Sequence, residues 1–111
     1  MNKLLKIALD YDDTFTANPL LFKMLVLVAK GQGHDVKFVT YRSARCNNDD
    51  IVADANELDI EIIFTDGAQK QHKYDADIWI DDDPVTICRA KDLGDMYDGC
   101  LINNDMGEDL L

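Results

Sequence analysis

Apolar runs alternate with amphipathic segments along the chain, a pattern typical of strands and helices that follow one another. Near-continuous apolar runs indicate strands buried on both faces. An Asn-Pro pair at 18–19 supplies a helix cap and a first-turn proline, Asn48 or Asp49 caps a second helix, and Asp83-Pro84 starts a third. The pattern predicts strands at 3–9, 35–40, 60–65, 77–80 and 99–102, with helices at about 18–30, 48–58 and 84–91.

Each of the first two predicted helices carries apolar residues at helical spacing. Such spacing predicts the face that packs on the sheet. The predicted buried stripe is Leu21, Met24, Leu25 and Val28 in the first helix, and Ile51, Val52, Ala55 and Leu58 in the second. After the third strand, Asp66-Gly67 predicts a turn, followed by a short helix or loop through Tyr74.

The alternation of strands and helices predicts an α/β fold. The expected architecture is a three-layer parallel sheet of about five strands with helices on both faces and right-handed crossovers. At 111 residues the chain is expected to form a single domain, 1–111, with an acidic tail at about 103–111.

Carboxylates gather where two of the predicted strands end. One group follows the first strand and the other follows the fourth: Asp10, Asp12 and Asp13, then Asp81, Asp82 and Asp83. Parallel strands bring their carboxyl ends to one edge of the sheet, so the two groups and Thr40 are expected to share one crevice. Oxygen-only ligands of this kind favour a hard cation, with Mg²⁺ preferred. A calcium-binding EF-hand loop does not fit, because Phe15 occupies the position that needs glycine.

The ordered set of these residues resembles the haloacid-dehalogenase superfamily, whose members are mostly phosphatases. Asp10 to Thr14 reads as DxDxT after a hydrophobic strand, Thr40 ends the second strand, a lysine precedes the fourth, and IDDDP ends it. The resemblance covers residues 3–84 and implies a Rossmannoid sheet. The gaps between motifs leave no room for a cap domain, so the chain is similar to short, capless, stand-alone members of the phage type.

The resemblance also implies roles for individual residues. Asp10 would be the nucleophile that forms an aspartyl-phosphate, and Asp12 the general acid/base. Thr40 would bind the phosphoryl group, and Lys70 would neutralise charge, with Lys73 as the alternative lysine. The implied Mg²⁺ ligands are Asp10, the Asp12 backbone carbonyl and Asp81, with Asp82 ligating or orienting that shell. Arg42 and Arg45 are candidates for substrate binding, or solvated loop cations.

These roles predict a Mg²⁺-dependent phosphomonoester hydrolase, and two alternatives stay open. One is a receiver-like signalling module, in which Asp66 at the end of the third strand would accept the phosphoryl group. The other is a catalytically inactive protein that binds metal or phosphate. The expected partner is a phosphorylated small molecule, nucleotide or macromolecule, and the sequence leaves the oligomeric state open.

Charge, cysteine content and the first apolar run indicate which partners, which thiol state and which cellular location to expect. The net charge of −11 disfavours nucleic acid as a partner, because phosphate backbones bind basic faces. Three scattered cysteines, Cys46, Cys88 and Cys100, predict free thiols. Lys6 interrupts and Asp10 ends the first apolar run, so we expect neither a signal peptide nor a membrane segment, and a cytoplasmic location.

Overall fold

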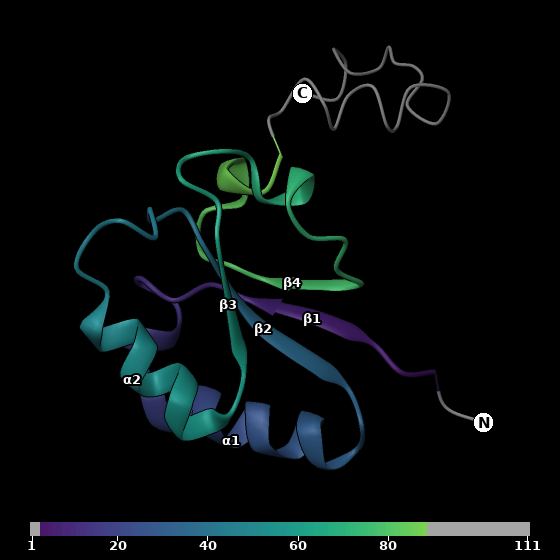
Figure 1. The fold of residues 1–111 in the computed structure, drawn as a ribbon. Helices are drawn as coiled ribbons and strands as arrows, with labels where there is room; N and C mark the ends of the chain where they lie inside the picture. The colour runs from purple at the N-terminus through teal and green to yellow at the C-terminus, as the bar shows by residue number, and fades with distance from the viewer. Residues whose placement is uncertain (1–2, 89–111) are drawn as a thin grey trace, which may run out of the picture.

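The computed structural model describes residues 3–88 and contains a four-stranded parallel sheet (Figure 1). The strands are β1 (Lys6–Leu9), β2 (Asp35–Thr40), β3 (Glu61–Phe64) and β4 (Ile78–Ile80), in the spatial order β3-β2-β1-β4. Every strand pair is parallel. The prediction of an α/β fold with a parallel sheet is therefore confirmed. The predicted fifth strand at 99–102 and the tail at 103–111 lie outside the described residues.

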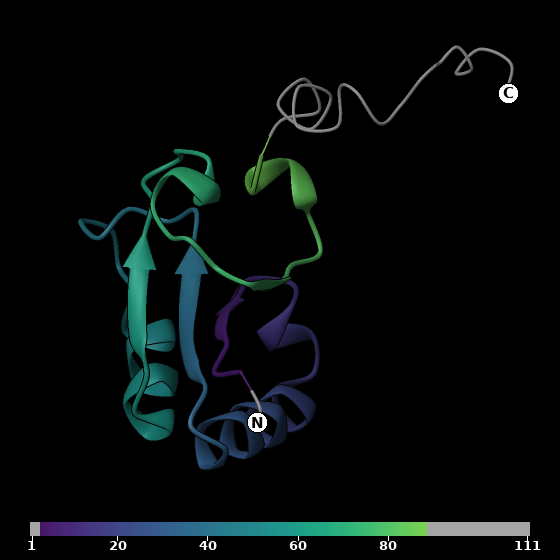
Figure 2. The ribbon, with the colours of Figure 1, turned by 90° about the vertical axis from the view of Figure 1, so that its right-hand side faces the viewer.

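The two α-helices, α1 (Pro19–Gly31) and α2 (Asp49–Leu58), lie side by side on one face of the sheet (Figure 2). Lys23 on α1 and Glu57 on α2 form an ion pair of 3.2 Å between them. Helices were expected on both faces of the sheet. Within residues 3–88, however, the α-helices cover one face only. None of the helices in this part of the chain has the length and apolar character needed to cross a membrane.

The core fills the space between the sheet and these helices. Alternate side chains of the strands point into it, because successive residues of a strand face opposite sides. Among the buried core residues are Ile7, Leu9, Val36, Phe38, Val26, Ile51, Ala55 and Leu58. On the opposite face Tyr74 packs edge-on against Trp79, with 6.5 Å between the ring centres.

Helix α1 begins as predicted, but its predicted buried stripe is wrong. The Asn18 side chain accepts a hydrogen bond from the Leu21 backbone N–H, and Pro19 occupies the first turn. Leu21, Met24 and Val28 are each more than half exposed and Leu25 is only partly buried, whereas Val26 and Ala29 are buried. The helix is apolar on almost every side, so its periodicity does not single out the face that meets the sheet.

Smaller differences lie at the ends of elements. The first strand is shorter than expected and begins at Lys6, and Val52 on α2 is 40% exposed, although Ile51, Ala55 and Leu58 are buried as predicted. The segment after Asp83 forms a 3₁₀ turn, η3 (Pro84–Thr86), and the remainder of the predicted third helix lies mostly outside the described residues. A second 3₁₀ turn, η2 (Lys70–His72), precedes β4.

Candidate functional site

The two acidic groups meet at the carboxyl edge of the sheet. Strands β1 and β4 are neighbours, and the Asp10 backbone N–H donates to the Ile80 carbonyl oxygen over 2.9 Å. This register places Asp10 beside Asp81 and Asp82 across the two strand ends. Asp10, Asp81 and Asp82 each offer an oxygen within 4.8 Å of the others.

An aromatic cluster supports the loop that follows β1. The rings of Tyr11, Phe15 and Phe38 lie with their centres 5.1–5.5 Å apart, and all three residues are buried. The Tyr11 side chain packs into this cluster, and its two neighbours, Asp10 and Asp12, line the cavity at the carboxyl edge of the sheet. Asp13 has a positive φ of 64°, which reverses the chain and leaves its side chain exposed.

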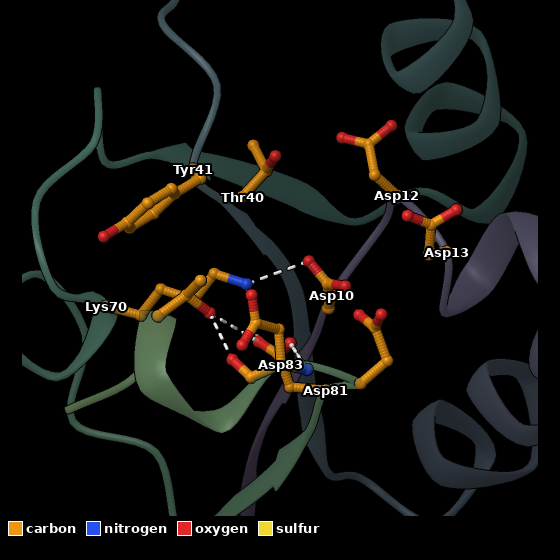
Figure 3. Close-up of a pocket in the computed structure, with 10 residues that line it drawn as sticks. Asp10, Asp12, Asp13, Thr40, Tyr41, Lys70, Asp81 and Asp83 are labelled. Carbon is orange, nitrogen blue, oxygen red and sulfur yellow. Dashed lines mark hydrogen bonds and ion pairs between the residues drawn. The ribbon is translucent and has the colours of Figure 1, made fainter. Parts of the chain in front are cut away.

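Lys70 is the buried cation of the site (Figure 3). It lies on η2 and is 1% exposed. Its Nζ donates to Asp10 Oδ1 over 2.8 Å and to Asp81 Oδ2 over 2.5 Å. One ammonium thus bridges carboxylates from two different strand ends, which brings Asp10 and Asp81 together. Lys73 is exposed and does not line the cavity.

Thr14 joins the same two strand ends through its hydroxyl. Its Oγ1 lies 2.9 Å from Asp10 Oδ2 and 3.1 Å from Asp82 Oδ1, and it accepts a hydrogen bond from the Asp82 backbone N–H. The hydroxyl has one proton for the two carboxylates. Asp81 Oδ1 in turn accepts from the Asp83 backbone N–H over 3.0 Å, so Asp83 supports Asp81 through its backbone.

The site carries more negative than positive charge. Three carboxylates, Asp10, Asp81 and Asp82, lie close together, and the single ammonium of Lys70 contacts two of them. Burial raises the pKa of Asp10 to about 6 despite the opposing effect of Lys70. A second cation would offset this imbalance. A set of carboxylate oxygens from three side chains fits Mg²⁺ in ligand type, since hard divalent cations prefer oxygen donors.

Asp12 lies at the rim of the same cavity but faces Arg42. Arg42 Nε and Nη2 donate to the two oxygens of Asp12 over 2.9 and 2.7 Å. Figure 3 shows its carboxylate directed away from Lys70, unlike that of Asp10. Arg42 also donates to Asp50, and these bonds hold the pKa of Asp50 at about 2. Arg45 is largely exposed and lies 3.6 Å from Asp66.

A cavity of about 200 Å³ opens over this group of side chains. Thr40, at the end of β2, is 1% exposed and lines it, although its hydroxyl accepts from the Arg42 backbone N–H within the protein. The complete lining is Asp10, Asp12, Asp13, Thr40, Tyr41, Lys70, Asp81, Asp82, Asp83 and Thr86.

The structure therefore brings the predicted residues Asp10, Thr40, Lys70, Asp81 and Asp82 to one cavity, and places Asp12 at its rim. Thr14 had no predicted role of its own, and the signal for it was the threonine of DxDxT; it bridges Asp10 and Asp82. Arg42 was expected to bind substrate or to be a solvated loop cation, and the structure instead places its partly buried guanidinium on Asp12.

Comparisons of the chain with protein-family models, curated proteins and solved structures gave no match.

Proposed function

We propose that this protein is a Mg²⁺-dependent phosphomonoester hydrolase that acts through an aspartyl-phosphate on Asp10. The observation that carries the proposal is the bridge from Lys70 to Asp10 and Asp81 beside Asp82, at the edge where β1 and β4 end. This combination offers a carboxylate nucleophile, a cation site and a fixed ammonium within one cavity.

The chemistry requires compensation of charge. A phosphoryl group in transfer spreads negative charge over its equatorial oxygens, so a carboxylate approaches it only when cations are close. Bound Mg²⁺ would neutralise the phosphoryl oxygens and orient them for in-line attack. Asp10, Asp81 and Asp82 would hold the ion, with the Asp12 backbone carbonyl as a further ligand, and Lys70 supplies the resident positive charge.

The proposed reaction has two steps that share one intermediate. An Asp10 oxygen forms a bond to phosphorus while the bond to the leaving oxygen breaks, and Asp12 gives that oxygen its proton. A water molecule then attacks phosphorus, Asp12 takes the proton of the water, and the Asp10–phosphorus bond breaks to release phosphate. Two carboxylates two residues apart divide the work because their surroundings differ. Bound Mg²⁺ and Lys70 would keep Asp10 ionised as the nucleophile against the effect of burial, which raises its pKa to about 6, whereas the Asp12 side chain is 51% exposed and directed away from Lys70 (Figure 3).

The proposal specifies the substrate only as a phosphate monoester. Within residues 3–88 the connections between β1 and β2 and between β2 and β3 contain only η1 (Phe15–Ala17) and the helices α1 and α2, so no inserted domain covers the cavity in this part of the chain. An uncovered site accepts phosphate esters of different sizes.

The receiver-like alternative has less support. It needs Asp66 as the phosphoryl acceptor, but Asp66 lies in the turn after β3 with a positive φ of 54° and does not line the cavity. Incubation with acetyl phosphate followed by mapping of the modified residue separates the two ideas. Label on Asp10 supports the hydrolase, and label on Asp66 rejects it.

A panel of phosphate esters tests the proposal itself. It includes aryl phosphates, nucleotides, sugar phosphates and phosphorylated DNA ends, each with Mg²⁺ or with EDTA. Release of phosphate that requires Mg²⁺ is expected for at least one class. Absence of turnover across the panel contradicts the proposal and favours an inactive binding protein.

A further inference from the structure

Two carboxylates lie on either side of the Arg42 guanidinium. Asp12 comes from the loop after β1, and Asp50 from the first turn of α2. Arg42 Nε and Nη2 donate to Asp12 over 2.9 and 2.7 Å, while Nη1 and Nη2 donate to Asp50 over 2.7 and 2.9 Å. Each carboxylate thus receives two hydrogen bonds, the geometry that a planar guanidinium provides and an ammonium does not.

Tyr11 and Asn48 also hold the Arg42 side chain in place. Its guanidinium carbon lies 5.2 Å from the centre of the Tyr11 ring, which is buried in the aromatic cluster under the loop. Nη1 also lies 3.4 Å from Asn48 Oδ1. The Arg42 side chain is only 22% exposed, so it is a fixed group rather than a solvated loop cation.

We propose that Arg42 is a positioning residue that sets the orientation of Asp12, with Asp50 as its anchor on α2. The inference rests on the proposed hydrolase function, in which Asp12 gives and takes the proton. The side-chain hydrogen bonds of Arg42 within residues 3–88 go to Asp12, Asp50 and Asn48, so it acts through Asp12.

The hydrogen bonds from Arg42 to both Asp12 and Asp50 explain how the orientation of Asp12 is maintained. The Asp12 side chain is half exposed and belongs to a loop, so without a partner it would sample several rotamers. Both of its oxygens accept from Arg42, and each oxygen keeps a further lone pair with which Asp12 can exchange a proton. Asp50 keeps the guanidinium in place, and Asp12 therefore remains close to its working position.

This role has a kinetic signature that general destabilisation of the fold does not share. A leaving group that departs readily as an anion needs little help from a general acid, whereas an alkoxide needs a proton. Loss of the correct Asp12 orientation therefore slows hydrolysis of an alkyl phosphate much more than that of 4-nitrophenyl phosphate. A misfolded fraction lowers both rates equally.

The experiment measures kcat and KM with Mg²⁺ on 4-nitrophenyl phosphate and on glycerol phosphate. Arg42→Gln is expected to lower kcat on glycerol phosphate by about 100-fold and on 4-nitrophenyl phosphate by about threefold or less, with KM unchanged, since a general acid contributes 10²–10⁴. Asp50→Asn keeps the shape of the side chain and removes the charge that holds Arg42. It is expected to lower kcat on glycerol phosphate by about tenfold, and again to have little effect on 4-nitrophenyl phosphate. Asp49→Asn, a neighbouring charge change on α2, leaves both rates unchanged.

Equal losses on both substrates, a rise in KM alone, or full activity in Arg42→Gln overturns the positioning role and leaves the hydrolase proposal intact. A wild-type protein that is inactive on the whole panel of phosphate esters overturns the hydrolase proposal, and this inference with it. Asp50→Asn guards against a folding defect in Arg42→Gln, because Asp50 is exposed and its replacement retains the side-chain volume.

Discussion

Lys70 and Asp10, sixty residues apart in the chain, form a buried ion pair of 2.8 Å at the carboxyl edge of the sheet. The same ammonium lies 2.5 Å from Asp81. A lysine that bridges two strand ends offsets part of the charge of both carboxylates, and it therefore links the stability of this edge to the proposed chemistry.

Replacement of Lys70 by methionine tests that link. The substitution retains most of the length of the side chain but leaves two buried carboxylates without their cation, a change that costs about 3–5 kcal/mol. We expect a loss of about this size in the free energy of unfolding at pH 7 in EDTA, measured with urea, and a smaller loss with Mg²⁺. Lys73→Met, at an exposed position, is the control, and equal stability of the two variants would contradict the bridging role.

The Thr14 hydroxyl is expected to control the affinity of the metal site. Thr14→Val retains the shape and removes the hydroxyl that joins Asp10 to Asp82. Groups that orient metal ligands typically contribute 10- to 100-fold in affinity, so we expect Mg²⁺ to bind about tenfold more weakly. Calorimetric titration with Mg²⁺ measures the change, and Thr14→Ser should restore the affinity. Unchanged binding in the valine variant would show that Thr14 has no part in the site.

Stability should depend on pH through Asp10 when no metal is bound. Burial raises its pKa from 3.8 to about 6, so the folded state retains a proton that the unfolded state has lost. The free energy of unfolding therefore falls as pH rises from about 4 to about 6, by up to about 3 kcal/mol relative to Asp10→Asn. Urea unfolding of both proteins in EDTA measures the difference, and saturating Mg²⁺ should abolish the fall. Parallel curves for the two proteins would refute this explanation.

Much of the fold follows from local patterns in the sequence. The apolar run before Asp10 and the run that ends at Thr40 marked two strands, and Asn18-Pro19 marked the start of α1. The buried face of α1 could not be read in this way, because Leu21, Met24 and Val28 on one side are as apolar as the residues that meet the sheet. Which apolar side is covered depends on tertiary packing rather than on periodicity.

The site, too, could be predicted from the sequence only in part. The convergence of Asp10 with Asp81 and Asp82 follows from the rule that parallel strands end at one edge. The choice between Lys70 and Lys73 does not, since it depends on how η2 directs its side chains. The grip of Arg42 on Asp12 also needs the path of the loop after β2, and no sequence spacing fixes that path.

The most direct test of the central claim is release of phosphate by the wild-type protein and by Asp10→Asn. Asp13→Asn is the matched control, because Asp13 lies at the exposed mouth of the cavity without a proposed catalytic or metal-binding role, and asparagine tolerates its positive φ. The hydrolase proposal predicts Mg²⁺-dependent turnover in the wild-type protein and in Asp13→Asn. In Asp10→Asn it predicts loss of at least about 10³-fold in kcat with the fold intact, since the nucleophile is gone. Turnover retained in Asp10→Asn would contradict it.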